Sequence, residues 1–200
     1  MQARDDQRYH HGDLRSALLT AALDRLEADG PSALSLRALA RAVGVSPMAP
    51  YHHFKDRKAL LAAVATAGFE RLQQHKLENE AAHRNAREAL PAGAANYVRF
   101  ILGNPNLYRL MQSSEFAERD TYPELHRAAA APAGTLRKLI ARAFEEHGVQ
   151  GRSIEDCARM VWGLAHGIGT LALDGQISRD AAPELAQSGT AAMVEGWLNR

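Results

Sequence analysis

The chain has 200 residues, 46% of them apolar and 24% charged, so it can bury a core but holds only one or two domains. Lysine and arginine (24) nearly balance aspartate and glutamate (23), and this excludes a protein held to nucleic acid or an anionic membrane by bulk charge alone. Its single cysteine, Cys157, excludes an internal disulfide and a cysteine-based zinc site. We see neither a signal-peptide core nor a membrane span, and expect a cytoplasmic protein with no membrane partner.

Apolar residues recur at spacings of three and four along most of the chain, which predicts an all-α fold of about nine helices. A polar, flexible arm at 1–12 precedes a first helix, which Asp13 caps and which ends at 29. Ser35 is the expected N-cap of a short second helix at 36–43, and Gly44 ends it. Ser46 is the expected cap of a third helix, which opens with Pro47.

A long fourth helix is expected to begin near Asp56 and to turn five residues inward: Leu60, Leu61, Val64, Gly68 and Leu72. Five further helices follow, with breaks at 103–105, 113–122, 148–153 and 174–182. The division that this implies is a first helical domain at 13–75 and a C-terminal helical domain at 76–200.

The last two predicted helices are the most apolar part of the chain. Ser153 caps the first of them, and we expect this helix to be buried on most sides, with Ile154, Val161, Leu164, Ile168 and Leu171 in one stripe and Trp162, His166 and Leu173 beside it. The final helix carries Leu185, Gly189, Met193 and Trp197 at a spacing of four, with small residues alongside. This spacing predicts a face that another helix can approach closely.

The second and third helices have the pattern of a helix-turn-helix, whose second helix enters the DNA major groove. Its exposed residues are Pro47, Met48, Ala49, Tyr51 and His52, none of which reads bases in the bidentate way of arginine, asparagine or glutamine. We therefore expect apolar base contacts, with Arg37 of the preceding helix on a guanine edge. Pro50 removes a backbone hydrogen bond from this short helix, so we expect the packing of Tyr51 and Phe54 to hold it.

The run 44–61, which contains Tyr51-His52-His53-Phe54, resembles the DNA-binding domain of the TetR family of bacterial regulators from Leu14 to about Phe69. The resemblance implies base contacts by Arg37, Pro47, Met48 and Ala49, and phosphate contacts by Tyr51 and His53. We place His52 with the base contacts and Ser35, Lys55 and Arg57 with the phosphate contacts. The chain departs from the family at Pro50, where leucine or isoleucine is commoner, and at Arg57, where lysine is usual.

Segments 9–15 and 162–167 look like the TetR subgroup whose C-terminal domain is named for its Trp, His and Gly. The family implies that 13–75 is a DNA-binding domain and that 76–200 binds a small-molecule effector in a pocket and forms a homodimer through the last two helices. It also implies repression at a double-stranded DNA operator, which binding of the effector relieves. The DNA-bound protein would lie on the nucleoid. Our candidates for the pocket are Tyr97, Phe100, Met111, Trp162 and His166, and for the dimer interface Leu185, Gly189, Met193 and Trp197.

Several residues have a second interpretation. His10 and His11 fit an unstructured tail as well as a DNA-contacting arm, and core packing explains Trp162 and His166 at least as well as ligand contact. His52 and His53 are adjacent, so they point about 100° apart on a helix and fit phosphate better than metal. Cys157 is expected to be a small buried hydrophobe.

Two broader readings compete with a DNA-binding regulator. The sequence lacks catalytic triads, phosphate-binding loops and metal-ligand spacings, so we expect no enzyme, no cofactor and no metal. The alternative is a helical small-molecule-binding or scaffold protein without DNA binding. The net charge does not argue against the regulator: residues 1–60 hold nine Lys and Arg against seven Asp and Glu, a net charge of +2 that indicates a modest basic surface, whereas the remainder has a net charge of −1.

Overall fold

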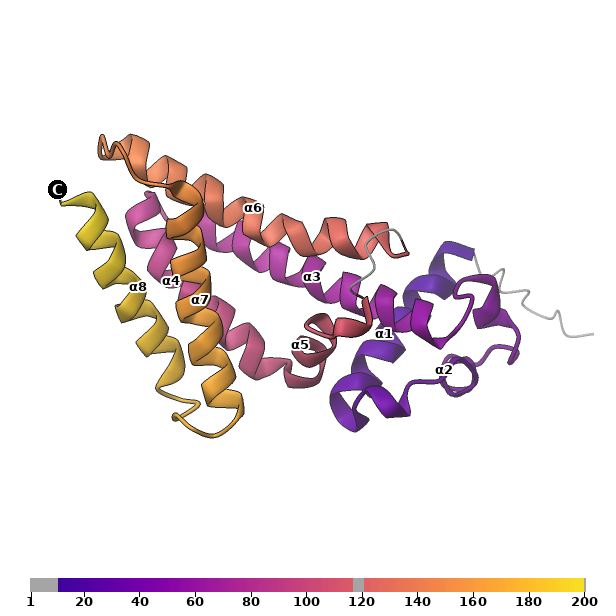
Figure 1. The fold of residues 1–200 in the computed structure, drawn as a ribbon. Coiled ribbons are helices and arrows are strands. Elements are labelled where there is room, and N and C mark those ends of the chain that lie inside the picture. The colour runs from indigo at the N-terminus through magenta and orange to yellow at the C-terminus, as the bar shows by residue number, and fades with distance from the viewer. Residues whose placement is uncertain (1–10, 117–120, 200) are drawn as a thin grey trace, which may run out of the picture. The chain divides into compact units, whose positions relative to one another are not determined.

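The structure, a computed structural model, describes the backbone of residues 11–116 and 121–199, and side chains from Leu14 onward. The predicted contacts of His10 and His11 therefore lie outside the side chains described. Eight α-helices are present: α1 (His11–Asp29), α2 (Leu36–Ala42), α3 (Arg57–Ala82), α4 (Ala86–Gly103), α5 (Pro105–Met111), α6 (Pro123–Glu146), α7 (Ile154–Leu173) and α8 (Ala182–Leu198) (Figure 1). Three short 3-10 helices join them, η1 (Pro31–Ala33), η2 (Ala49–His52) and η3 (Ser114–Phe116), and the described residues contain no strand.

The predicted all-α fold is confirmed, and the five C-terminal helices, α4 to α8, lie between the predicted breaks. Two predictions about the N-terminal part are wrong. The first helix begins at His11, two residues before the proposed cap Asp13, and the third helix is the 3-10 turn η2 instead of an α-helix.

The chain packs as two compact units, one reaching to Ala65 and the other starting at Thr66, so α3 belongs to both. In the first unit, leucines from α1, the η1–α2 segment and α3 form the core, including the fully buried Leu18, Leu34, Leu39 and Leu60. All five residues that we expected α3 to turn inward are buried. The functional division proposed at residue 75 of the same helix stays a prediction.

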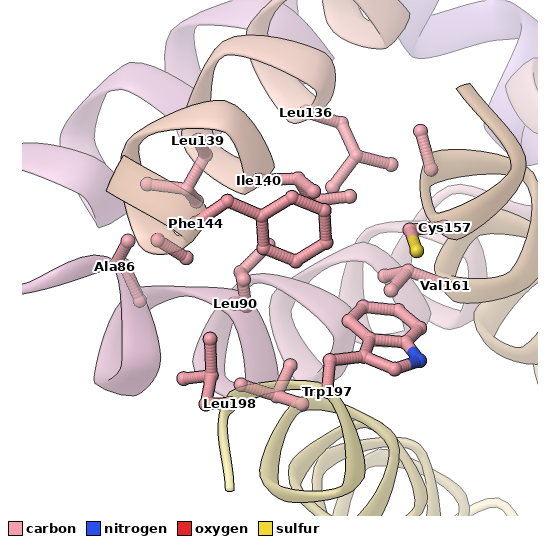
Figure 2. Packing of buried hydrophobic residues seen from close by; sticks show 14 residues of the cluster. Ala86, Leu90, Leu136, Leu139, Ile140, Phe144, Cys157, Val161, Trp197 and Leu198 are labelled. Carbon is pink, nitrogen blue, oxygen red and sulfur yellow. The ribbon is translucent and has the colours of Figure 1, made fainter. Parts of the chain in front are cut away.

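In the second unit, α4, α6, α7 and α8 surround a common apolar core (Figure 2). Trp197 of α8 lies edge-on to Phe144 of α6, with 6.3 Å between ring centroids and an interplanar angle of 87°. Cys157 is buried in the same cluster, as predicted, and burial raises the pKa of its thiol.

The expected burial of α7 on most sides is wrong for the chain alone. Ser153 caps the helix as predicted, by accepting a hydrogen bond from the backbone N–H of Asp156 at 3.2 Å. Only one side of α7 contributes to the core, however, and Ile154, Met160, Trp162 and Leu171 are exposed. An apolar helix that its own fold covers on one side leaves a surface suited to a partner.

Candidate nucleic-acid interface and ligand cavity

The turn that follows α2 has the hydrogen-bond pattern that glycine permits at a helix end. Gly44 has a φ of +74°, a left-handed conformation that strains residues with a Cβ. The N–H of Val45 donates to the carbonyl of Ala40 at 2.9 Å and that of Gly44 to Arg41 at 3.3 Å, which is a Schellman motif. At the start of α2, the Ser35 hydroxyl accepts from the N–H of Ala38 at 3.1 Å, so the predicted cap is confirmed.

Proline explains why the second helix of the pair is a 3-10 turn. Pro50 has no N–H to donate to Ser46, and its ring clashes with that carbonyl in an α-helix. The Ser46 carbonyl instead accepts from Ala49 at 3.0 Å, and Tyr51 donates to Met48 at 3.1 Å. Ser46 is not the cap, because Met48 occupies that position. The sequence therefore presents a compact turn where a longer reading helix was predicted.

The residues of this turn divide into a buried and an exposed set. Pro50 and Phe54 are buried and hold the turn, so the prediction that Tyr51 shares this packing is wrong: Tyr51 is 40% exposed. Met48 is 65% exposed. The predicted base-contacting residues lie at the surface: Arg37, Pro47, Met48 and His52 are exposed and Ala49 is half-buried.

The predicted phosphate-contacting residues differ in which of their polar atoms remain available to a phosphate. Ser35 uses its oxygen as a helix cap, which leaves its hydroxyl proton for a phosphate. Lys55 is exposed. His53 buries its Nε2 without a partner among the described residues, so a phosphate contact has to use Nδ1.

The side chain of Arg57 makes two hydrogen bonds within the first unit. Its Nε donates to the carbonyl of Leu34 at 2.9 Å and its Nη2 to that of Pro31 at 2.5 Å. These bonds connect the start of α3 with the segment before α2. Arginine suits this position because its planar fork bonds two carbonyls at once, whereas the lysine usual in the family has a single flexible ammonium.

We expect Arg57→Ala to lower the free energy of unfolding of the first unit by about 1–3 kcal/mol, because it removes two hydrogen bonds from a charged donor. Hydrogen exchange of the α1 and α2 amides measures this loss. Lys55→Ala is the matched control, and it should leave exchange unchanged while lowering the salt dependence of DNA binding by about one contact. Unchanged exchange in Arg57→Ala, together with a lower salt dependence, would make Arg57 a phosphate ligand only.

The second unit contains a cavity of about 420 Å³ whose lining comes from α3, α4, α6 and α7, with Gln112 beside α5. Among the predicted pocket residues, Tyr97 and Trp162 line it. Phe100 and Met111 are instead packed in the core, Met111 against Gly68 of α3. His166 does not line this cavity.

His166 belongs to a hydrogen-bond network that connects α4, α5 and α7. The hydroxyls of Tyr97 and Tyr108 each lie 3.2 Å from its Nδ1, and Tyr108 also lies 3.2 Å from the Thr170 hydroxyl. Burial lowers the pKa of His166 and raises the pKa of Tyr97 to about 12. A neutral imidazole and two protonated tyrosines are the forms that this network needs at neutral pH.

Sequence reasoning missed Lys76, which lines the cavity from α3. A signal was present, because Leu60, Val64, Gly68 and Leu72 are spaced by four on the inward face and the next position in that series is 76. Burial lowers the pKa of Lys76 to about 8. The described residues offer its ammonium neither a hydrogen bond nor an ion pair.

The exposed apolar surface of α7 and α8 differs from the predicted dimer interface. Of the four predicted residues only Leu185 is exposed, at 49%; Trp197 is 6% exposed and Met193 packs on the core. Gly189 lets α7 approach within the protomer, since a Cβ there would lie 3.0 Å from Leu164. The outward positions, which we name the α7–α8 face, are Met160, Gly163, Gly167 and Leu171 on α7 and Leu185, Ser188, Ala192 and Gly196 on α8.

Within residues 11–116 and 121–199, no three histidine, cysteine, aspartate or glutamate side chains are grouped as a metal ion requires. The helices described there include none that is both long and apolar enough to cross a membrane.

A helix-turn-helix unit followed by a helical unit with a cavity defines a class of DNA-binding transcriptional regulator. Residues 18–64 match the family described as bacterial regulatory proteins, tetR family, and residues 90–194 match the tetracyclin repressor-like C-terminal domain. The chain belongs to the TetR family of transcriptional regulators. Regulators of this family are generally not enzymes.

Solved structures share this fold over nearly the whole chain. A protein of unknown function from Rhodococcus sp. RHA1 is 33% identical, with a TM-score of 0.82 over 96% of this chain and 100% of its own. PfmR, a TetR family regulator from Thermus thermophilus, is 19% identical, with a TM-score of 0.65 and coverage of 92% and 99%. A TetR/AcrR family regulator from Thermobifida fusca is also 19% identical, with a TM-score of 0.72 and coverage of 90% and 97%.

Proposed function

We propose that the protein is a repressor that binds a near-palindromic operator as a homodimer in the cytoplasm and leaves it when a small molecule occupies the C-terminal cavity. The observation that carries this proposal is the turn at η2, where Met48 and Tyr51 are exposed and Pro50 and Phe54 are buried. Large apolar side chains are exposed at a cost in water, and here they occupy the part of a helix-turn-helix that meets the major groove.

The turn reads DNA chiefly by shape and apolar contact. Pro47, Met48 and Ala49 offer methyl and methylene groups suited to thymine methyls, with His52 beside them. Arg37, exposed on α2, supplies the bidentate contact to guanine that the turn lacks. Phosphate contacts set the position of the protein along the duplex, and they come from Tyr51, Ser35, Lys55 and Nδ1 of His53.

Dimerisation uses the α7–α8 face, which keeps Leu185 of the four residues first proposed and replaces Gly189, Met193 and Trp197 by other outward positions. On each helix, the outward residues follow the spacing i, i+3, i+7 and i+11, so they share one side. No protein atom lies within 4 Å of a Cβ built on Gly163, Gly167 or Gly196. A second copy can therefore approach closely, and a two-fold axis brings the same surface from both protomers together.

The effector acts through α3. Phe69, Leu72 and Lys76 line the cavity, and the same continuous helix carries Leu60 and Val64 into the core of the DNA-binding unit. A ligand that moves this helix changes the spacing of the two reading turns and so lowers operator affinity. We also propose that the chain belongs to the Trp-His-Gly subgroup, from the sequence of segments 9–15 and 162–167, and that it acts by binding without catalysis.

Selection of bound sequences from random DNA tests the reading turn. Wild-type protein should select two inverted half-sites that contain a guanine at a fixed position. Arg37→Ala should lose about 1–3 kcal/mol of discrimination at that guanine and keep the rest of the site. Arg41→Ala, on the same helix and exposed, is the control and should keep the guanine. Selection of no sequence by the wild-type protein would refute the proposal.

A further inference from the structure

The cavity of the second unit is apolar on most sides but carries several charges. Its walls include Leu72, Tyr97, Leu136 and Trp162. Its volume, about 420 Å³, falls in the range of sites for small organic ligands, about 300–1,000 Å³. The charged side chains that border it are Lys76 on α3, Arg137 on α6, and Glu155 and Arg159 on α7.

Three of these charged residues, Arg137, Glu155 and Arg159, form ion pairs with one another at the surface, whereas Lys76 forms none with the described residues. Glu155 lies 3.6 Å from Arg137 and 3.4 Å from Arg159, so its charge is matched twice. Lys76 is half-buried and has no carboxylate partner among the described residues. It also borders two smaller hollows beside the main cavity, one of them lined by Leu90, Gly93 and Ala94 together with the polar Asn79 and Thr135.

An ammonium without a hydrogen bond or an ion pair in a largely apolar cavity is disfavoured, because burial removes water from the charged form. The lowered pKa of Lys76, about 8, reflects that cost. At neutral pH the group is still mainly protonated, so the cavity contains a cation to which the described residues offer no counter-charge. A ligand with a negative charge would remove this penalty on binding.

We propose that the effector is a small amphipathic organic acid whose carboxylate pairs with Lys76 while its apolar body lies against Leu136 and Trp162. This inference rests on the proposed function, since it names the class of ligand that the same cavity takes. A single ammonium favours a monoanion; phosphate groups are held by several donors or by arginine forks. The excess of positive charge around the cavity attracts anions to it.

The titration of Lys76 gives the proposal a pH signature. Groups that border Lys76 in these hollows are His75 on α3, Tyr97 on α4, Arg137 on α6, and Glu155 and Arg159 on α7. The pKa of Tyr97 is raised to about 12, so its hydroxyl stays protonated over the range in which Lys76 titrates. Affinity for an acid should be constant between the pKa of the acid's own carboxyl group and about pH 8, because the ligand is then ionised and Lys76 is charged. Above that it should fall by up to about tenfold per pH unit, because binding then requires proton uptake.

The experiment compares 2-naphthoate with its neutral analogue 2-naphthamide by calorimetry on the full chain. Lys76→Met, which keeps an unbranched apolar side chain, should weaken naphthoate by about ten- to a hundredfold and leave naphthamide unchanged. Lys138→Met removes an exposed lysine of α6 outside the cavity and should change neither. Lys76→Met should melt no lower than wild type, since it removes a disfavoured charge.

Equal weakening of both probes by Lys76→Met, or a naphthoate affinity that does not fall above pH 8, would overturn the inference. Operator binding is measured on the same ligand-free samples. A wild-type protein that binds naphthoate through Lys76 but selects no DNA would count against the proposed function and not against the anion site. A protein that selects DNA but binds naphthoate and naphthamide with equal affinity would count against the anion site and not against the proposed function.

Discussion

Gly167→Leu is expected to separate the dimer while leaving each protomer folded. The residue lies at the centre of the outward side of α7, and a Cβ built there meets nothing within 4 Å in the protomer. Leucine also favours helix over glycine by about 1 kcal/mol, so the isolated protomer gains stability. In a dimer, however, the added side chain keeps the two α7–α8 faces apart.

Loss of the dimer should reduce operator affinity by about 10²–10⁴-fold, because each half-site then has to be bound without the effective concentration that its partner supplies. Analytical ultracentrifugation measures the association and gel-shift titration the affinity. Gly134→Leu on α6 is the matched control, since it also replaces a helical glycine with open space around it. A Gly167→Leu dimer as tight as wild type would place the interface elsewhere.

Trp197→Ala is expected to lower the free energy of unfolding by about 3–5 kcal/mol, the range for removal of a large aromatic side chain from a core. Trp197 is 6% exposed and packs edge-on against Phe144, where four helices converge (Figure 2). Urea denaturation followed by circular dichroism gives the value without relying on tryptophan fluorescence, which the substitution changes.

Trp162→Ala provides the comparison, because the two residues are the only tryptophans of the chain and Trp162 is 51% exposed. Its loss should cost much less stability. Similar losses for the two substitutions would contradict the assignment of Trp197 to the core. Intact stability of Trp197→Ala with a weakened dimer would restore Trp197 to the interface that its spacing first indicated.

The periodicity of apolar residues was enough to predict the class of fold and most helix ends. The caps at Ser35 and Ser153 and the turn at Gly44 could be predicted because each depends on local chemistry, a hydroxyl near an N–H or a residue without a Cβ. Pro50 is the local exception. The loss of one backbone hydrogen bond at Pro50 was evident from the sequence. Whether the segment then forms an α-helix or a 3-10 turn depends on the hydrogen bonds of several residues together, which the sequence pattern does not show.

The direction in which a helix faces could not be predicted in the same way. On α8 the large residues Met193 and Trp197 indicated an interface, but both pack in the core of the protomer. The smaller residues Ser188, Ala192 and Gly196 face outward instead. Burial against other helices and burial against another copy produce the same apolar stripe in a sequence. The lining of the cavity was predicted only in part: Tyr97 and Trp162 were identified, but Lys76 was overlooked because it is polar, although its position continues the inward series of α3.

A footprint of the purified protein on fragments of its host genome tests the central claim most directly. We expect protected sites that are near-palindromes, with half-site centres separated by about one helical turn, 34–36 Å, or a multiple of it. Protection should disappear in Gly167→Leu at protein concentrations that saturate the wild type. A protein that protects no fragment, with or without small organic acids added, would contradict the assignment of this chain as a dimeric operator-binding repressor.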